Sequence, residues 1–426
     1  MTYQNPTLNG FPLPQKFLNG KIHNWYRMVL GFSDHLVGQL LDRFGIQPGQ
    51  KVIDPFCGTG TTLIEAMKRG IDCVGIDANP SSIFATVVKT NWGLKSKRLK
   101  ELLNEMRQKK ILYLRRKAEF RHDPTYLYLE STGMIERGWI SPEPLRKAIA
   151  IKISISDLHT SEKYKNALML ALIAEVINSA SNVKFGPELY CGPAKVDSDV
   201  FSGFVERIRF IAKDLDSVAA LSYGNAKVFQ GDARECYNLL RNAAPGPYAA
   251  VICSPPYPAE HDYTRNSRLE LAFLENISDR QSLQAIKKRM IRSHTKGVYK
   301  GDNDGVLVSN NRALNAIVRE LKDKVKHKKH GFARLYPTVV KEYFGGMKRH
   351  LISIKSLLSP GAQCAYVLGD QSSYLRVHIP TAEILSSIAE EAGFETVEIR
   401  HWRSRWSSTT SKQIDENILI LRKWDS

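Results

Sequence analysis

Short apolar runs alternate with amphipathic runs in two separated stretches of the chain. In the first stretch, KVID (51–54) and DCVGID (72–77) have strand patterns. Helix patterns follow them at TLIEAMKR (62–69) and PSSIFATVVKTNW (80–92). The second stretch contains further strand patterns at AKVFQGD (226–232), AAVIC (249–253) and QCAYVLGD (363–370). Alternation at this short spacing predicts parallel βαβ units.

Two more strand patterns lie near the end of the printed sequence. FETVEIR (394–400) and ENILILRK (416–423) are joined by HWRSRWSSTTSKQID (401–415), which has no helical periodicity. The pattern therefore predicts an antiparallel hairpin closing an otherwise parallel sheet, with residues 401–415 as its loop.

The alternation is interrupted between the two stretches. Residues 95–121 contain eleven Lys or Arg and three Glu, and the chain is mostly helical in period up to about residue 222. We therefore predict an α/β fold with a doubly wound, mostly parallel sheet, divided into 1–92 (an N-terminal arm and the first half of the sheet), 93–222 (a largely helical insertion) and 223–426 (the second half). We expect the insertion at the carboxyl ends of the strands, where ligand-contacting loops lie in such sheets.

The charge balance is strongly basic. The formal net charge is +18 and the sequence pI is about 9.5, which favours a polyanionic partner such as nucleic acid. The insertion is our first candidate for target recognition, and residues 280–335 are the second.

The cysteine pattern and the hydropathy of the chain bear on metal binding, cellular location and membrane association. None of the six cysteines forms a CxxC pair or a Cys/His cluster, so we expect no metal site. Widely spaced cysteines favour free thiols and a cytoplasmic location. Because no apolar run is long enough to span a membrane, we expect no membrane association.

A glycine-rich turn, DPFCGTGTT, follows the first strand. Gly58 and Gly60 let the backbone approach a ligand closely, but the third glycine of a dinucleotide site and the GK[ST] of a P-loop are absent. Asp54 would repel a pyrophosphate and attract a sulfonium or ammonium group. The turn therefore favours S-adenosylmethionine over a tight turn without a ligand. The candidate contacts in the turn are Asp54, Pro55, Phe56, Cys57, Gly58, Gly60, Thr61 and Thr62.

Two further acids end the next strands. Asp77, followed by Ala78, is placed to bind a ribose, and Asp232, followed by Ala233, to accept from an adenine amino group. Either acid alone is also compatible with a helix cap. Acids at the ends of three successive strands favour a nucleoside cofactor. Trp25, Tyr26 and Phe32 are candidates for the same pocket or for core packing.

The fourth strand runs into Ser254-Pro255-Pro256-Tyr257. Two consecutive prolines fix φ and lack N–H groups, so they make a stiff corner that presents a hydroxyl, free carbonyls and an aromatic ring. Such a corner can hold a flat polar group.

The two motifs together resemble those of the amino-methyltransferases, which methylate exocyclic amines of nucleobases. DPFCGTGTT is similar to their motif I and Ser254 to Tyr257 to their motif IV, and the resemblance covers about 1–90 and 223–426. It implies a seven-stranded Rossmann-like methyltransferase sheet, S-adenosylmethionine as cofactor and double-stranded DNA as substrate. It also allows a restriction endonuclease acting on the same site as a partner, and either a monomer or a dimer. The Ser-Pro-Pro-Tyr form resembles the N4-cytosine enzymes of restriction–modification systems.

The family chemistry assigns roles to these residues. The amine would donate to the Ser254 hydroxyl and the Pro255 carbonyl, Tyr257 would stack on a flipped-out cytosine, and the methyl group would transfer by direct in-line displacement. Cations near the site are candidates for nucleic-acid contacts: Arg265, Arg268, Arg403 and Arg405.

Three other functions remain open. In this chain the cofactor motif precedes the catalytic motif, an order closer to that of alpha-type enzymes, so N6-adenine methylation of DNA stays an alternative. RNA base methylation and a non-enzymatic DNA-binding module with a vestigial pocket are the others.

Overall fold

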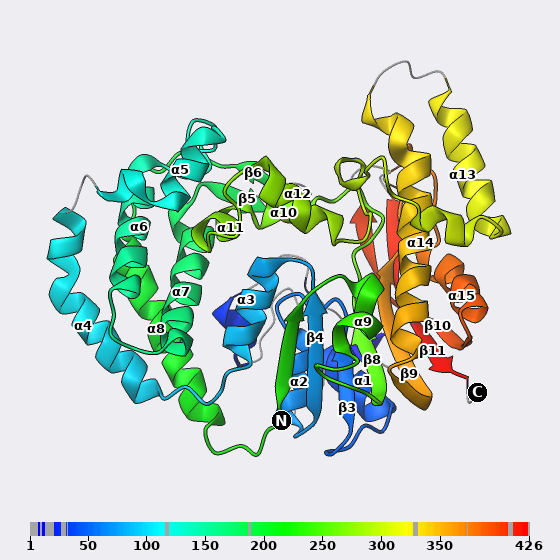
Figure 1. Cartoon of the computed structure of the whole chain (residues 1–426), viewed down its shortest axis with the longest axis horizontal. Helices are drawn as coiled ribbons and strands as arrows, with labels where there is room; N and C mark the ends of the chain where they lie inside the picture. The colour runs from blue at the N-terminus through cyan, green and yellow to red at the C-terminus, as the bar shows by residue number, and fades with distance from the viewer. Residues whose placement is uncertain are drawn as a thin grey trace.

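The chain folds around one large mixed sheet (Figure 1). The computed structural model describes residues 7–8, 11–12, 21–26, 31, 33–115, 119–185, 189–326, 331–372, 374–407 and 412–424. Most of the N-terminal arm, including the candidate Phe32, lies outside these residues.

Seven strands form the sheet in the order β10-β11-β9-β8-β3-β4-β7. Strands β3, β4, β7, β8 and β9 are parallel to their neighbours in this group, and β11 is antiparallel to both β9 and β10. The predicted α/β fold with a mostly parallel sheet and a closing hairpin is confirmed. The strands are β3 (Lys51–Asp54), β4 (Asp72–Asp77), β7 (Ala226–Gln230), β8 (Tyr248–Cys253), β9 (Leu358–Gly369), β10 (Phe394–Ser407) and β11 (Lys412–Lys423).

Successive residues of the central strands enter two separate cores. Val52 and Ile252 belong to one buried cluster, whereas their neighbours Ile53 and Val251 belong to the other. This follows from the two-residue period of a strand. The sheet is therefore covered on both faces, as a doubly wound sheet requires. One face carries α1 (Asp34–Arg43), α2 (Thr61–Lys68) and α3 (Pro80–Lys89), and the other carries α9 (Cys236–Leu240), α14 (Tyr336–Lys355) and α15 (Thr381–Glu391).

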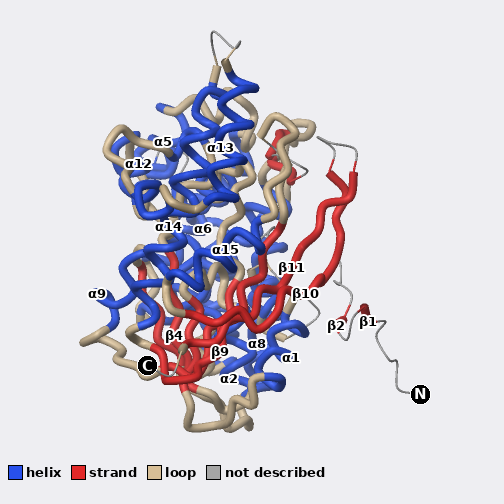
Figure 2. The backbone as a smooth tube through the Cα atoms, turned by 90° about the vertical axis from the view of Figure 1, so that its right-hand side faces the viewer, coloured by secondary structure: helices blue, strands red, loops and turns tan. Residues whose placement is uncertain are grey.

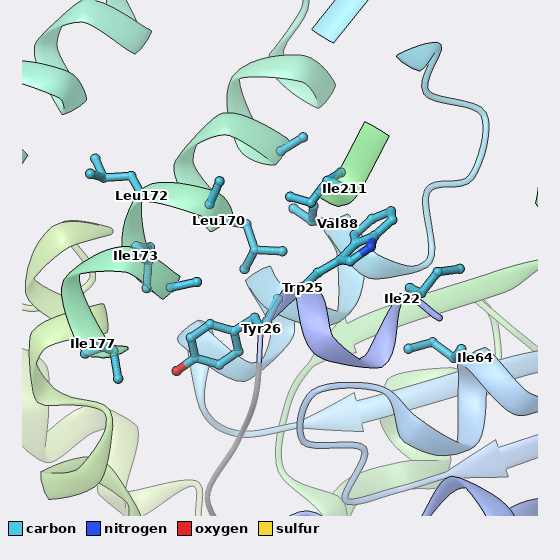
Figure 3. Close-up of a cluster of buried hydrophobic side chains, with 14 of the residues drawn as sticks. Ile22, Trp25, Tyr26, Ile64, Val88, Leu170, Leu172, Ile173, Ile177 and Ile211 are labelled. Carbon is cyan, nitrogen blue, oxygen red and sulfur yellow. The ribbon is translucent and has the colours of Figure 1, made fainter. Parts of the chain in front are cut away.

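The segment between α3 and β7 is largely helical, and it packs beside α3 (Figure 1). Buried side chains of these helices join the same core as α1–α3, and Figure 3 shows Leu170 and Ile211 close to Trp25 and Val88. The helices are α4 (Ser96–Arg115), α5 (Pro124–Ser131), α6 (Pro142–Ser156), α7 (Glu162–Glu175) and α8 (Val200–Val218), and a π-helical turn spans Val176–Ala180. A small antiparallel pair, β5 (Val183–Phe185) and β6 (Leu189–Cys191), interrupts them.

The expected position of the insertion was wrong at its attachment points. The chain leaves the sheet after α3 and returns at Asn225, whose carbonyl accepts from the Cys73 N–H at the start of β4. Both connections therefore lie at the amino ends of the strands, because a crossover helix runs back from the carboxyl end to the amino end. The insertion approaches the carboxyl edge through β5 and through Ile177 and Asn178 of the π-helical turn.

Residues 258–335 contain several helices above the sheet (Figure 1). The second half of this segment packs against α14, whereas its first half packs against α3 and α5. The α-helices are α10 (Tyr263–Asn266), α11 (Arg268–Phe273), α12 (Arg280–Lys288) and α13 (Arg312–Val325). The remaining short elements are β1 (Thr7–Leu8), β2 (Phe11–Pro12), η1 (His23–Trp25), η2 (Glu119–His122), η4 (Ala233–Glu235), η5 (Thr295–Gly297), η6 (Asp304–Val308) and η7 (Phe332–Leu335). Among the described residues, no helix has the length and apolar character needed to cross a bilayer.

The closing hairpin is longer than predicted. Residues 401–407 and 412–415, expected as a loop, continue the two strands, with Arg403 opposite Glu416 and Trp406 opposite Gln413. The cause is tertiary: Trp402 is buried and the arginines pair across the strands, which sequence periodicity alone does not reveal. Since β9 stops pairing at Gly369, the end of the hairpin extends beyond its neighbour (Figure 2).

Candidate functional site

The carboxyl edge of the sheet gathers most of the predicted site residues. Strand β3 pairs in parallel with both β4 and β8, so Asp54, Asp77 and the Ser254 corner all leave the sheet at the same edge. Asp232 leaves it after β7, the neighbour of β4. This edge is where α/β sheets of this type bind ligands.

The glycine turn is fixed by its neighbours. Gly58 and Gly60 have φ values of 50° and 85°, in the left-handed region that favours glycine. The Gly58 N–H donates to Asp77 Oδ2 at 2.9 Å, and its carbonyl accepts from Thr86 Oγ1 at 2.8 Å. A Cβ at Gly60 would come within 2.9 Å of Thr86 Cγ2. Both glycines are therefore required by the shape of the turn.

Asp54 is buried with half of its carboxylate unused. Its Oδ1 accepts from the Phe56 N–H at 3.0 Å, while Oδ2 has no hydrogen-bond partner within the described residues. Burial raises the pKa of Asp54 to about 7. A buried carboxylate oxygen without a donor is costly, so a cationic ligand fits this position.

Asp77 is the anchor of two turns rather than a helix cap. Besides Gly58 it accepts from the Asn79 N–H at 2.7 Å, and burial raises its pKa to about 6. The cap of α3 is Asn79, whose side chain accepts from the Ser81 N–H. The structure thus gives Asp77 a fixed orientation at the strand end.

The other predicted cofactor contacts differ in their exposure. Pro55, Cys57, Thr61, Thr62 and Ala233 are buried, whereas Phe56, Gly58 and Ala78 are partly exposed at the edge. Thr62 Oγ1 donates to the Ile252 carbonyl at 3.1 Å, so its hydroxyl joins α2 to β8.

Asp232 is held in an ion pair. Its Oδ2 lies 2.6 Å from Arg234 Nη2, and Arg234 Nη1 reaches Asp304 at 2.6 Å. The Asp232 carboxylate also accepts from the Arg234 N–H and begins a short helix there. It is therefore less available to an adenine than Asp54 is to a cation.

The double-proline corner lies against the end of β9. Ser254 Oγ donates to the Val367 carbonyl at 3.3 Å, and the Tyr257 N–H donates to Tyr263 Oη at 3.3 Å. Pro255 is buried, and Pro256 and Tyr257 are partly exposed. The Tyr257 ring rests on Gly369, where an added Cβ would be 2.8 Å from Tyr257 Cε2. The corner is thus rigid, with one face of it accessible.

The four arginines predicted to contact DNA lie in two regions of the chain. Arg265 donates to the Leu189 carbonyl of β6 at 3.3 Å, and Arg268 donates to the Thr264 carbonyl at 3.3 Å.

Arg403 and Arg405 both pair with Glu416, which is buried. The Arg403 guanidinium also lies 4.3 Å from the centre of the Trp402 ring. Because one carboxylate balances only one of the two guanidinium charges, this group of three residues keeps a net positive charge.

A cavity of about 330 Å³ beside the glycine turn was not predicted. It is bounded by Thr59, by Ser81 and Ser82 of α3, by Tyr263 and Glu270, and by Lys184 of β5. Tyr26 also lines it and donates to Glu270 Oε1 at 2.5 Å, whereas Trp25 is buried and donates to Asp214 at 3.0 Å. Figure 3 shows these two aromatic side chains pointing in different directions. The only sequence signal for Glu270 is an acid between Leu269 and Leu271 in an apolar helix run.

Comparison with known proteins gives consistent matches. A family model described as DNA methylase matches residues 33–87. The type II methyltransferase M.BsoBI of Geobacillus stearothermophilus is 24% identical, with 95% of this chain and 85% of the relative covered. M.AvaI of Nostoc sp. is 24% identical over 88% of this chain and 80% of the relative. Among solved structures, TrmN from Thermus thermophilus is 11% identical with a TM-score of 0.29, and covers 93% of this chain and 50% of its own.

The two type II relatives match nearly the full length of the chain, and the family model matches the segment that holds the glycine turn. These similarities support a DNA amino-methyltransferase that depends on S-adenosylmethionine.

Proposed function

We propose that this DNA methyltransferase transfers a methyl group to the exocyclic N4 amine of a cytosine in double-stranded DNA. The observation that carries the proposal is the Ser254-Pro255-Pro256-Tyr257 corner at the end of β8, beside the strand that ends in Asp54. The corner presents acceptors for an amine and an aromatic ring for a base, next to a carboxylate suited to a cation.

The cofactor supplies an electrophilic methyl group on a sulfonium. Asp54 Oδ2 would hold its cationic part, and Asp77, which fixes the turn through Gly58, would accept from its ribose. Gly58 and Gly60 would allow the backbone to approach it closely. Positioning of this kind leaves the chemistry to the cofactor and the geometry to the protein.

The corner makes the amine reactive by holding it. Ser254 Oγ donates to the Val367 carbonyl at 3.3 Å and lies 3.5 Å from Tyr257 Oη, which leaves it a lone pair to accept from the cytosine amine. The Pro255 carbonyl accepts the second N–H. These two bonds favour a pyramidal nitrogen whose lone pair points at the methyl group for in-line displacement. Tyr257 stacks on the base.

The target base must leave the duplex to reach the corner, because the corner is closed on one side by β9. We propose that residues 1–92 and 223–426 carry catalysis and that the basic insertion, 93–222, contributes target recognition. The relatives are named type II methyltransferases, and we infer from this similarity that the enzyme belongs to a restriction–modification system. We further propose a cytoplasmic location and an endonuclease of matching specificity as its partner.

N6-adenine methylation is the second candidate. The order of the motifs, with the glycine turn ahead of the corner, favours it. An adenine N6 amine would use the same two acceptors, so the corner alone does not exclude it.

Product analysis tests the proposal directly. The protein is incubated with labelled S-adenosylmethionine and duplex DNA or tRNA, and the nucleic acid is hydrolysed to nucleosides. N4-methylcytosine from DNA is expected. N6-methyladenine would show that the methylated base is adenine instead of cytosine, and label in tRNA would show that the substrate is RNA. Absence of transfer to either nucleic acid would indicate a non-enzymatic binding module.

Variants test the division of roles. Ser254→Ala should remove most transfer and leave cofactor affinity largely intact, whereas Asp54→Ala should weaken cofactor binding. Ser222→Ala, at an exposed position, is the matched control and should change neither. Equal loss of cofactor binding in the Ser254 and Asp54 variants would contradict the assignment.

A further inference from the structure

Glu270 is a buried acid that the proposed chemistry does not use. Its side chain belongs to α11, is 3% exposed and lines the cavity beside the glycine turn. Oε1 accepts from Tyr26 Oη at 2.5 Å, but Oε2 is buried without a hydrogen-bond partner among the described residues. No described cation forms an ion pair with it. This buried carboxylate oxygen lacks a hydrogen-bond donor, and a ligand in the cavity can provide one.

The cavity adjoins both halves of the proposed site. Thr59, from the glycine turn, forms one part of its wall, and Tyr263 forms another. Tyr263 Oη accepts from the N–H of Tyr257, so this wall touches the corner that holds the base. A ligand whose reactive centre lies at the corner can therefore extend a substituent into the cavity.

Another part of the lining carries the complementary charge. Lys184, from β5 of the insertion, lines the cavity together with Ser81 and Ser82 in the first turn of α3. Helix N-termini and lysines favour anions. The cavity thus offers an anionic side at Glu270 and a cationic side at Lys184, an arrangement that suits a zwitterion.

We propose that this cavity takes the amino-acid tail of the cofactor, with Glu270 Oε2 receiving its ammonium group and Lys184 Nζ its carboxylate. The inference rests on the proposed function, because it assumes that the sulfonium lies at the corner. It makes the insertion a part of the cofactor site, since β5 supplies one of the two charges.

The burial of Glu270 accords with this role. Burial raises its pKa to about 7, so its charged form is disfavoured in the empty cavity. An ammonium placed against Oε2 stabilises the carboxylate. The competing explanation is structural: the Tyr26 hydrogen bond holds residues 21–26 on α11, and Glu270 has no ligand.

Two ligands that differ only in the tail separate these explanations. S-adenosylhomocysteine carries the amino-acid tail and 5′-methylthioadenosine lacks it, and the affinity of each is measured by calorimetric titration. Glu270→Gln preserves shape and removes the charge. We expect this substitution to weaken the affinity for S-adenosylhomocysteine about 10- to 100-fold, the range for a charge-assisted hydrogen bond. The affinity for 5′-methylthioadenosine should change less than about twofold.

Lys184→Gln provides a second variant at an exposed position, and should also weaken only the ligand with the tail. Glu206→Gln, exposed on α8, is the matched control and should leave both affinities unchanged. Equal weakening of both ligands by Glu270→Gln would assign Glu270 a structural role and overturn the inference. An unchanged affinity for S-adenosylhomocysteine in both cavity variants would also overturn it. Failure of the wild-type protein to bind either ligand would instead overturn the proposed function itself.

Discussion

The contact between Gly369 and Tyr257 gives a direct test of how the catalytic corner is positioned. Gly369 ends β9, and the edge of the Tyr257 ring lies where its Cβ would be. Gly369→Ala adds one methyl group beneath the ring and leaves Ser254 and the glycine turn unaltered.

The size of the perturbation follows from two distances. The added Cβ would lie 2.8 Å from Tyr257 Cε2 and 3.0 Å from Cδ2. Ordinary carbon contacts are about 3.5–4.0 Å, so the ring must move by about 0.7–1 Å. A displacement of this order at a reacting site costs roughly 100-fold in rate. Because Tyr257 as a residue is partly exposed, the loss of stability should be at the low end of the overpacking range, about 1 kcal/mol.

Single-turnover methyl transfer to duplex DNA, with saturating cofactor, measures the rate of the chemical step. Cofactor affinity is measured separately and should stay within about twofold, since Gly369 does not belong to the glycine turn. Gly301→Ala is the matched control, because a Cβ there meets no atom within 4 Å. A transfer rate within threefold of wild type, in a folded Gly369→Ala protein, would refute the role given to the Tyr257 ring.

Three further predictions concern charge, pH and stability. Lys152→Met should lower the free energy of unfolding in urea by about 3–5 kcal/mol, because Lys152 Nζ lies 2.9 Å from the buried Asp123 carboxylate, which would lose its counter-ion. The control, Lys213→Met at an exposed position, should lower it by less than about 0.5 kcal/mol. Cofactor affinity should fall as pH drops below about 7, because Asp54 and Glu270, each with a pKa of about 7, then gain a proton and lose their charge. A Kd that is flat between pH 8 and 5.5 would contradict this, and Asp54→Asn should make the profile shallower. Thr62→Val should cost about 1–3 kcal/mol by leaving a β8 carbonyl without its donor, and an unchanged unfolding midpoint would refute that estimate.

The parts of the fold that depend on local sequence were predictable. The strand before Asp54 and the strand before Ser254 are apolar runs with clear ends, and the prolines of the corner dictate an irregular turn wherever they occur. The antiparallel closing pair also follows from two strand patterns without a helix between them.

Features that depend on distant contacts were not predictable. The pairing of Arg403 with Glu416 extends the hairpin, and the ion pair of Arg234 with Asp304 joins residues 70 positions apart. The importance of Glu270 depends on a cavity formed by elements from both sides of the insertion. Period and propensity describe what one segment favours, and these contacts arise only after several segments are brought together.

The cavity is lined both by β5 of the insertion and by the glycine turn with α3, which has a thermodynamic consequence. A ligand that contacts both must be released before the inserted helices can open locally, so loading of the pocket should slow amide hydrogen exchange in α6 and α7, well outside the turn that first suggests a cofactor. By reciprocity, any DNA contact that tightens those helices must also raise the affinity of the pocket. An enzyme built this way would retain its methyl donor most firmly while it is seated on its target.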